Sequence, residues 1–409
     1  MRHLILPIAL LLLAGGCSKS PKAELPGNPG EAVPLAFYAH TPTYTRSNDI
    51  QTVGESFKFK VIAYGNGGTY IPLSEAGKGR SQGKADLWGT TTPYYWPDYP
   101  LYVFAYAPAT GGGVTPSFGG FRGNNRLSIE TPSNIADQKD VIAGCTTGTK
   151  APEMATGIAI NFRHLLAQID VKAKIGSKGS GHKIKVIGVK LGNFKTKAVF
   201  NYPANTDGTG LMRLGAFKFD TTPTRARLTA YSGTGTAPLE LSSTENKPLT
   251  PSGESFFVLP QATEKWLGPE QYAANKVAPS YTNSDTGAYL AVCMNVETVG
   301  GFNVIPRDSE GYTWVAVPLV DASGNALTFN PGTHYTINLI YFSGANDALQ
   351  LGYMEPHPAD TVTGSSITNI DATPDNNKNY PGKPVLTQQL KFSPTITAIE
   401  QETTITYNL

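Results

Sequence analysis

Cys17 is the residue whose surroundings most clearly specify a chemistry. It follows a short basic start, a nearly unbroken aliphatic run from Leu4 to Leu13, and the small residues Ala14-Gly15-Gly16. This order is typical of a secretory signal that ends at a small-residue cleavage site. Because the residue after that site is a cysteine, the pattern predicts a bacterial lipoprotein signal, with an acylated Cys17 thiol. The alternative is an ordinary secreted protein with an incidental cysteine.

The aliphatic run is much shorter than the roughly 20 apolar residues that a membrane-spanning helix needs. We therefore expect the chain to be tethered to a membrane rather than to cross it, because two or three acyl chains hold a protein stably at a bilayer. Residues 1–16 are assigned to the signal peptide. Residues 17–31, which are rich in Pro, Gly and Lys, are assigned to a flexible tether.

No other group of residues indicates catalysis or metal binding. The 6 histidines are scattered, no Cys/His pair has metal-ligand spacing, and the chain lacks a Gly-x-Ser-x-Gly or phosphate-binding motif. His164 is interpreted as a satisfied strand or turn histidine rather than as a ligand. The sequence thus predicts a protein that is not an enzyme, with no catalytic residues, metal site or cofactor.

The aromatic run from Tyr94 to Tyr99, Tyr-Tyr-Trp-Pro-Asp-Tyr, has two interpretations. Its rings could stack on a sugar, as in a glycan-binding protein. They could equally be structural residues of a β domain, which is the interpretation that we favour.

The composition indicates an exported β protein. The chain has 43 Gly, 31 Pro, 20 Tyr and 17 Phe, and its formal net charge is only +2, which gives no electrostatic case for nucleic-acid binding. Its 409 residues are enough for two or three domains that each bury a core. After Cys17 only Cys145 and Cys293 remain, and their separation favours two buried thiols over a disulfide.

The hydrophobic pattern has a period of two, which indicates half-buried strands. Turn clusters such as Gly65-Asn66-Gly67-Gly68 separate these runs, and only Glu264–Ala274 suggests a short helix. The strand candidates are Phe57–Tyr64, Tyr102–Ala107, Ile158–Phe162, Ile169–Ile175, Ile184–Leu191, Phe256–Leu259, Leu290–Val296, Trp314–Val320, Tyr335–Phe342 and Leu390–Tyr407.

Short strands with Gly/Pro punctuation and no alternating helices predict an all-β fold of antiparallel sandwiches. The weakest pattern near the middle of the chain is Thr146–Thr156. We therefore assign residues 32–154 to an N-terminal β-sandwich domain and residues 155–409 to a C-terminal β-sandwich domain with a C-terminal strand.

Several short segments, in order, resemble the fimbrillins, the major and minor fimbrial subunits of Bacteroidota. They span nearly the whole mature chain, and they follow a lipoprotein leader. They are Ala36-Phe37 with Thr45-Arg46, Phe57–Tyr64, Tyr95-Trp96-Pro97, Phe104–Pro108, Asp140–Ala143, Phe162–Ile169, Val258–Gln261 and Asn330–Tyr335.

The resemblance implies two tandem transthyretin-like Greek-key sandwiches and assembly into a surface fimbria. In that family an arginine-specific protease cuts after an arginine downstream of the lipidated cysteine and removes the first strand. The matching bond here lies between Arg46 and Ser47, in a polar stretch that we expect to be an exposed loop. The alternative is that Arg46 is an ordinary surface arginine.

The segment removed would be Ala32–Ala39. Pro34 cannot donate a ladder hydrogen bond, so we expect this segment at a sheet edge. The donated replacement would be Thr403–Leu409, in which Ile405, Tyr407 and Leu409 share one face. The same run could instead be a final strand that pairs within its own domain.

The resulting prediction is a structural subunit, stalk or tip, of an adhesive fimbria at the cell surface, exported as an outer-membrane lipoprotein. Its partners would be other fimbrial subunits, the outer membrane through the lipid anchor before processing, and a host or bacterial surface ligand, but no nucleic acid. The alternative is a surface glycan-binding lipoprotein that serves polysaccharide uptake.

Overall fold

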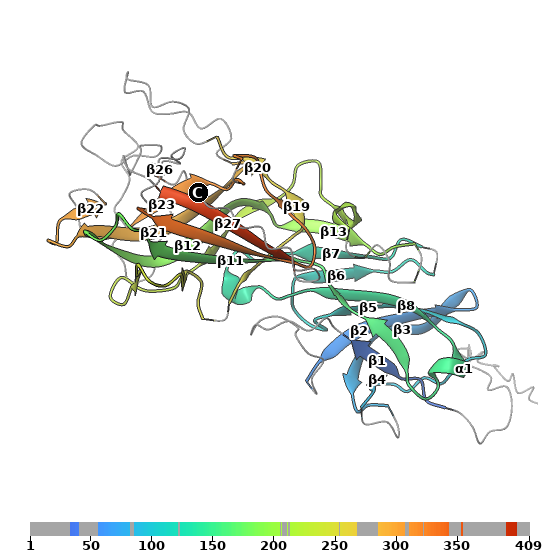
Figure 1. Ribbon diagram of the computed structural model, residues 1–409. Coiled ribbons are helices and arrows are strands. Elements are labelled where there is room, and N and C mark those ends of the chain that lie inside the picture. The colour runs from blue at the N-terminus through green and yellow to red at the C-terminus, as the bar shows by residue number, and fades with distance from the viewer. Residues whose placement is uncertain are drawn as a thin grey trace, which may run out of the picture.

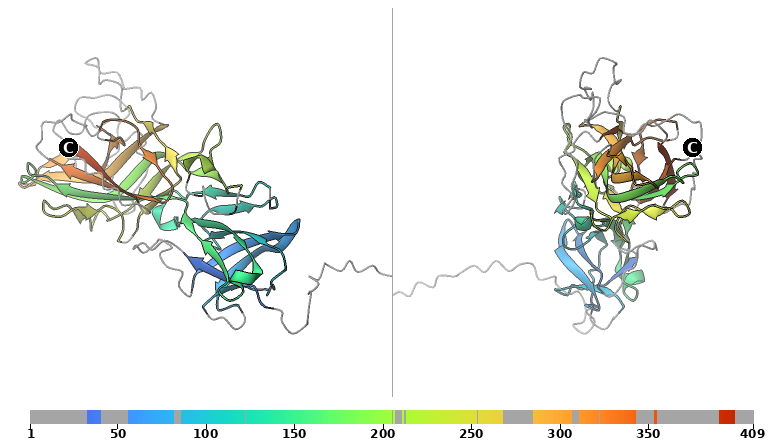
Figure 2. Two further views of the ribbon diagram at one scale, coloured as in Figure 1. Left: turned by 45° about the vertical axis from the view of Figure 1, so that its right-hand side comes forward. Right: turned by 90° about the vertical axis from the view of Figure 1, so that its left-hand side faces the viewer.

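The computed structural model describes residues 33–40, 56–81, 86–121, 123–204, 206, 211, 213–252, 254–267, 285–306, 311–321, 323–342, 353–354 and 390–398. These residues form an elongated, almost entirely β molecule, with the first sheet at one end and the β21–β23 sheet at the other (Figures 1 and 2). The predicted all-β class is confirmed. The two-domain, transthyretin-like description stays a prediction.

The first sheet contains eight described strands in the order β10-β8-β5-β2-β3-β4-β1-β9. Its two ends are adjacent in sequence, because only Phe162 separates β9 from β10, so the sheet curls around an aromatic and aliphatic core. Its strands are β1 (Phe37–His40), β2 (Lys58–Gly65), β3 (Gly68–Lys78), β4 (Trp88–Thr90), β5 (Leu101–Ala107), β8 (Ile142–Gly148), β9 (Ile158–Asn161) and β10 (Arg163–His164).

Glycines allow this sheet to close and to turn. A Cβ at Gly148 of β8 would lie 2.6 Å from the Cδ1 atom of Ile158, so the missing side chain lets β9 pack directly over β8. The β2–β3 hairpin turns at Asn66 (φ 45°) and Gly67 (φ 83°). Positive φ at both residues is the requirement of a type I′ hairpin, which an Asn-Gly pair meets at low cost.

A smaller sheet joins segments from both halves of the chain. Its order is β14-β13-β7-β6, and its strands are β6 (Val114–Ser117), β7 (Arg126–Glu130), β13 (Lys197–Asn201) and β14 (Phe217–Lys218). Phe200 and Leu127 of this sheet share a core with Phe104 and Tyr106 on the outer side of the first sheet. The two ends of the molecule are therefore connected through one hydrophobic layer.

The rest of the chain forms two sheets that face each other across the largest core. One sheet contains β11 (Ala167–Ile175), β17 (Lys247–Pro248), β18 (Phe256–Val258), β25 (Thr333–Tyr341) and β27 (Leu390–Ala398). The other contains β12 (His182–Lys195), β15 (Arg225–Ala230), β16 (Leu239–Glu240), β20 (Glu264–Lys265), β21 (Gly287–Thr298), β22 (Asn303–Ile305), β23 (Thr313–Pro318) and β26 (Tyr353–Met354). A separate pair is formed by β19 (Gln261–Ala262) and β24 (Thr328–Phe329).

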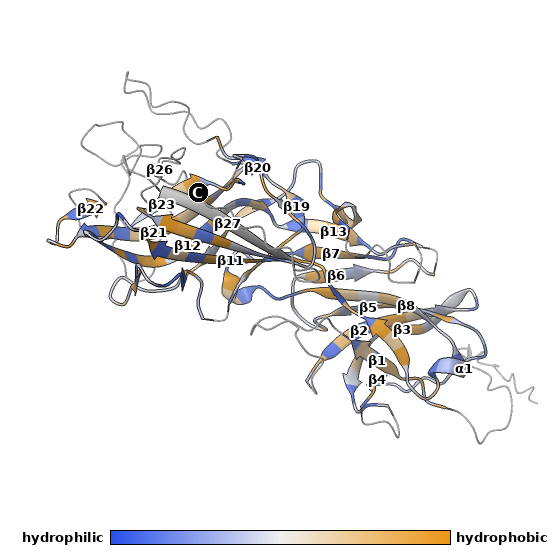
Figure 3. Cartoon of the chain, in the orientation of Figure 1, coloured by the Kyte–Doolittle hydropathy of each residue, from blue (hydrophilic) through white to orange (hydrophobic). Residues whose placement is uncertain are grey.

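Hydrophobic and polar residues alternate along many of these strands (Figure 3). Helical structure in the described residues is limited to α1 (Lys150–Glu153), η1 (Ile135–Asp137) and η2 (Leu214–Ala216). None of the helices in this described part is long and apolar enough to cross a bilayer.

The predicted strands are confirmed wherever the structure describes them, with ends that shift by a few residues. The predicted helix Glu264–Ala274 is wrong at its start, because Glu264 and Lys265 form β20, which pairs in parallel with β21. Tertiary pairing here overrides a local sequence preference. The last strand of the first sheet, β10, ends at His164, after the predicted domain boundary at residue 154.

Candidate functional site

The six residues predicted to be modified, cut or donated all lie outside the described residues. They are Cys17, Arg46, Ser47, Ile405, Tyr407 and Leu409. The structure does describe residues 33–40, which include all of the predicted removable segment Ala32–Ala39 except Ala32, and the whole of β1 with its neighbours. This segment and the place that it occupies in the first sheet, which we call the β1 slot, form the candidate site.

The first strand lies between β4 and β9, and not at an edge, so our edge prediction is wrong. Pro34 fits here because the sheet needs no backbone N–H donor at residue 34. It forms a bridge with Tyr95, and the flanking hydrogen bonds run from Leu35 N to Tyr94 O (2.7 Å) and from Trp96 N to Val33 O (3.2 Å). A proline therefore excludes a strand from a sheet interior only where its own N–H would be required.

The two sides of the slot hold β1 unequally. Against β4 the antiparallel register contains one Cα pair, Phe37 with Trp88. Against β9 the parallel register runs over the whole strand, from Phe37–Ile158 to His40–Asn161. Two hydrogen bonds from the β9 side complete this ladder, from Ile158 N to Ala36 O and from Phe162 N to His40 O, each 2.8 Å long.

Alternate side chains of the segment fill the core of the first sheet. Leu35, Phe37 and Ala39 are buried, whereas Tyr38 is 49% exposed. The ring of Phe37 meets Phe59 edge to face at 6.1 Å, and Phe59 in turn contacts Phe162 at 5.3 Å. The outer face of β1 is thus partly open to solvent, while its inner face contributes to an aromatic cluster.

Gly157 shapes the β9 side of the slot. Its φ is +78°, and a Cβ there would lie 3.1 Å from the carbonyl carbon of Phe37 and 3.2 Å from that of Ala36. The main chain of the first strand therefore passes closer to residue 157 than any side chain would comfortably allow. Only glycine combines this backbone conformation with so close an approach at low cost.

The aromatic run Tyr94–Tyr99 lies along the opposite side of the slot. The backbone of Tyr94 and Trp96 pairs with the segment ahead of β1, and the Trp96 side chain is buried in the same core. The Tyr70 hydroxyl donates a hydrogen bond to the Tyr95 carbonyl. Burial, together with the nearby hydroxyls of Tyr99 and Tyr94, raises the pKa of Tyr70 to about 12. These aromatic residues support the first strand, as the structural interpretation predicted.

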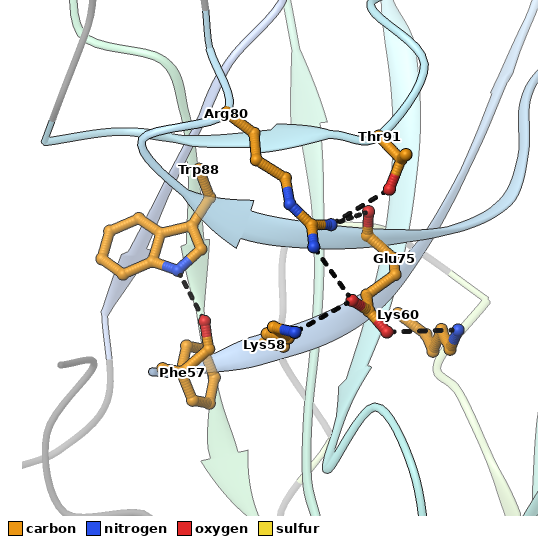
Figure 4. Close-up of polar contacts among 7 residues, drawn as sticks. All are labelled: Phe57, Lys58, Lys60, Glu75, Arg80, Trp88 and Thr91. Carbon is orange, nitrogen blue, oxygen red and sulfur yellow. Dashed lines mark hydrogen bonds and ion pairs between the residues drawn. The ribbon is translucent and has the colours of Figure 1, made fainter. Parts of the chain in front are cut away.

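A charged cluster lies on the outer face of the sheet, close to the slot. The Glu75 carboxylate is 3.7 Å from Lys58 Nζ, 3.8 Å from Lys60 Nζ and 3.3 Å from an Arg80 nitrogen (Figure 4). Arg80 also donates a hydrogen bond to the Thr91 hydroxyl at 3.0 Å, just after β4. Three positive charges therefore surround one negative charge, which leaves the cluster net positive.

The Arg80 segment lies flat against the sheet because two glycines make room for it. A Cβ on Gly77 would lie 3.0 Å from Arg80 Nε, and one on Gly89 would lie 2.7 Å from the Arg80 carbonyl carbon. These two glycines are paired across β3 and β4. The sequence did not predict this cluster, although the alternation of Lys58 and Lys60 with buried residues was a signal for their shared outer face.

Other polar groups that could resemble catalytic sets are arranged as structural contacts. His164 and Asp140 are both buried and lie 2.6 Å apart (Nδ1 to Oδ2), which confirms the interpretation of His164 as a satisfied histidine. Asp170 lies between Ser255, which donates to it, and His334 at 3.1 Å. Nucleophilic catalysis needs the histidine in the middle of such a trio, next to the serine, so this order does not activate Ser255.

Neither a metal site nor a disulfide is found in the described part of the chain. No group of three His, Cys, Asp or Glu side chains could hold a metal ion there. Cys145 and Cys293 are free and buried, as predicted, and burial raises the pKa of the Cys293 thiol.

The strand that precedes the predicted donor segment is β27. It pairs with β25 over its whole length, from Thr333–Ala398 to Tyr341–Leu390, at one end of its sheet. The strand candidate Leu390–Tyr407 is thus confirmed over residues 390–398. The donor residues that follow stay a prediction.

Comparison with known proteins identifies one family. A family model described as fimbrillin-like matches residues 45–341. None of the curated proteins compared with the chain matches it significantly.

Among solved structures, a fimbrial protein from Bacteroides vulgatus is 18% identical, with a TM-score of 0.49, and the match covers 76% of this chain and 96% of that one. A candidate cell adhesion protein from Bacteroides ovatus is 14% identical, with a TM-score of 0.42 and coverage of 77% and 94%.

Proposed function

The chain belongs to the fimbrillin-like family, and from this premise we propose that it is a structural subunit of a cell-surface fimbria, assembled by strand exchange. A fimbrial role follows from the family. The exchange step, the processing site and the lipid anchor are our additions. In this mechanism proteolysis after Arg46 releases the first strand, and the segment Thr403–Leu409 of a neighbouring subunit takes its place.

The observation that carries this proposal is that β1 is paired over fewer residues with β4 than with β9. One side offers the Phe37–Trp88 pair and, ahead of β1, the Pro34–Tyr95 bridge. The other side offers a continuous ladder of four residue pairs, and the outer face at Tyr38 is open. Loss of the strand would leave hydrogen-bonding groups on both β4 and β9, and an apolar trough where Leu35 and Phe37 were buried. Each such side chain contributes about 1.5–3 kcal/mol on burial.

A strand between two neighbours also explains why proteolysis would be needed. In the intact chain β1 has to break bonds with both neighbours at once, so spontaneous release is opposed. Cutting after Arg46, which follows β1, separates the strand from β2 and makes its loss irreversible once it dissociates. A replacement strand then gains main-chain hydrogen bonds on two sides, and pockets for alternate side chains.

The lipid anchor belongs to the same proposal. Acylated Cys17 would hold the unprocessed subunit at the outer membrane, and the cut after Arg46 would remove the anchor together with β1. Palmitate labelling of the wild-type chain in the producing cell, lost in Cys17→Ser, tests this step. Labelling that survives in Cys17→Ser would contradict it.

The decisive experiment treats the full chain with an arginine-specific protease. We expect one dominant product that begins at Ser47, followed by filaments visible by electron microscopy. Arg46→Ala should abolish both, and deletion of residues 403–409 should leave processed but monomeric protein. A fully processed wild-type protein that forms no filaments and retains selective sugar binding would instead support the glycan-binding alternative.

A further inference from the structure

The charged cluster beside the β1 slot has more positive charge than its single carboxylate neutralises. Lys58 is 52% exposed and Arg80 is 32% exposed at their side chains, so both can reach a further anion. Lys60 shares Glu75 with them. The cluster is held in place by Gly77 and Gly89, over which the Arg80 segment lies.

The cluster and the slot share the outer face of one sheet. Along β2, Phe59 points into the core, so its neighbours Lys58 and Lys60 point outward. Lys58 of β2 pairs with Gly77 of β3, and Gly77 pairs with Gly89 of β4. Trp88, next to Gly89, pairs with Phe37 of β1. With strands spaced about 4.8 Å apart, β1 lies about 10 Å from β3, over which the Arg80 side chain lies, and about 14 Å from β2. These separations are roughly one to two Debye lengths at physiological salt, so the attraction is strongest at low salt.

The residues just before the donor segment Thr403–Leu409 carry the complementary charge. After Lys391 the sequence to Leu409 contains no Lys or Arg, and its charged residues are Glu400 and Glu402. Both lie an even number of residues from Thr404 and Thr406, so in a continuous strand they would share the face opposite to Ile405. Because successive side chains of a strand point to opposite faces, filling the slot with Ile405 turns both glutamates outward, toward the side on which Lys58 and Arg80 lie.

The geometry points to a docking role for this cluster. Lys58, Lys60 and Arg80 receive Glu400 and Glu402 of the incoming subunit, and this contact steers the donor segment to the slot and favours one register within it. This inference rests on the proposed strand exchange and names the residues that guide it. Charge pairs at the rim of an interface act mainly on the rate of association and on specificity.

The test measures the initial rate of polymerisation of the protease-treated full chain by light scattering, at low and at high salt. Glu400→Gln with Glu402→Gln removes the donor charges without altering any described residue. We expect its rate to fall on the order of tenfold at low salt, and the difference to shrink at high salt. Lys58→Gln with Lys60→Gln should produce the same change.

Lys197→Gln is the matched control. Lys197 is 49% exposed and 3.7 Å from Glu130, nearly the same exposure and ion-pair distance as Lys58 with Glu75, but it lies on β13. Its polymerisation rate should equal that of the wild type. A charge exchange, Lys58→Glu and Lys60→Glu combined with Glu400→Lys and Glu402→Lys, should recover part of the lost rate.

The outcomes separate this inference from the proposed function. If the wild type polymerises and the Glu400/Glu402 variant does so at the same rate and with the same salt dependence, strand exchange stands and the docking role is wrong. If those rates are equal and only retention on a sulfated polysaccharide column depends on Lys58 and Lys60, the cluster binds an outside anion and the inference is also overturned. If the wild type never polymerises, both proposals fail.

Discussion

Two parallel strand pairs in this molecule differ greatly in how firmly they are held. The pair β1–β9 spans four residue pairs, whereas β11–β25 spans eight, from Gln168–His334 to Ile175–Tyr341. On its other side β1 has one residue pair with β4, but β11 is flanked by both β17 and β18. The same type of pairing thus holds β1 by a much shorter ladder than β11.

Burial differs in the same direction. Val171 of β11 is fully buried between the two large sheets, and the neighbouring sheet covers that face of the strand. On β1 only the inner residues are buried, and Tyr38 faces solvent. Regions with few buried contacts and short ladders are the ones that open locally at low free-energy cost. The shorter ladder and the open outer face of β1 are what its proposed removal requires, and β11 has neither.

The largest effect is expected from Val171→Asp in β11. The change places an unpaired carboxylate in the largest core, which costs several kcal/mol of folding free energy. We expect loss of soluble folded protein, measured by circular dichroism and expression yield. Lys172→Gln, at the next and partly exposed position, should fold normally. A folded Val171→Asp protein would mean that β11 is held no more firmly than β1.

Phe37→Ala in β1 should come next. Removing a fully buried phenylalanine costs about 3–5 kcal/mol, and here the loss should be local. Hydrogen exchange should therefore accelerate at residues 35–40 and remain slow at residues 168–175. Tyr38→Ala, on the exposed side, is the control and should change urea unfolding by less than about 0.5 kcal/mol. Equal acceleration in both regions would show that they unfold as one unit.

Gly157→Ala should have an intermediate effect. The new Cβ would be strained by the positive φ and would also press on the backbone of Phe37, so we expect a loss of about 2 kcal/mol. Gly67→Ala is the matched control, since it has a similar φ of +83° but nothing within 4 Å of its Cβ. The difference between the two variants in urea unfolding isolates the close approach. If they unfold alike, β1 is free to shift away from residue 157.

Tyr70→Phe should have the smallest effect. It removes the hydrogen bond to Tyr95, which is worth about 1 kcal/mol. The pKa of Tyr70 is raised to about 12 in the folded protein, above the roughly 10 of an unfolded tyrosine. The neutral hydroxyl therefore stabilises the fold fully below pH 10, and this contribution is lost as the pH rises toward 12.

Urea unfolding of Tyr70→Phe and wild type at pH 7 and pH 11 measures this dependence. We expect the wild type to lose part of its advantage over the variant at the higher pH. A difference that grows between pH 7 and pH 11 would have the wrong sign and would contradict the assignment.

Much of the fold could be predicted from local pattern, because each strand has to hide one face. The alternation of Phe59 and Val61 with their neighbours predicted β2, and the Asn66-Gly67 pair predicted the turn that follows it. Two predictions were wrong. Glu264–Lys265 pairs with β21 instead of forming a helix, and β1 lies between β4 and β9 instead of at an edge. Which strands pair depends on segments that are distant in the sequence, so the local sequence carries little sign of the pairing.

For the candidate site, the sequence by itself determined which side chains point inward, since alternation along a strand has only two faces. It therefore identified Phe59 and Val61 as residues of one strand face, and it favoured a structural role for the aromatic run Tyr94–Tyr99. Only the tertiary structure decided that β1 lies between two strands, that Gly157 sits against it, and that Lys58, Lys60 and Arg80 meet at Glu75. These facts depend on which strands become neighbours, and that choice is made by the packing of the whole sheet around its core.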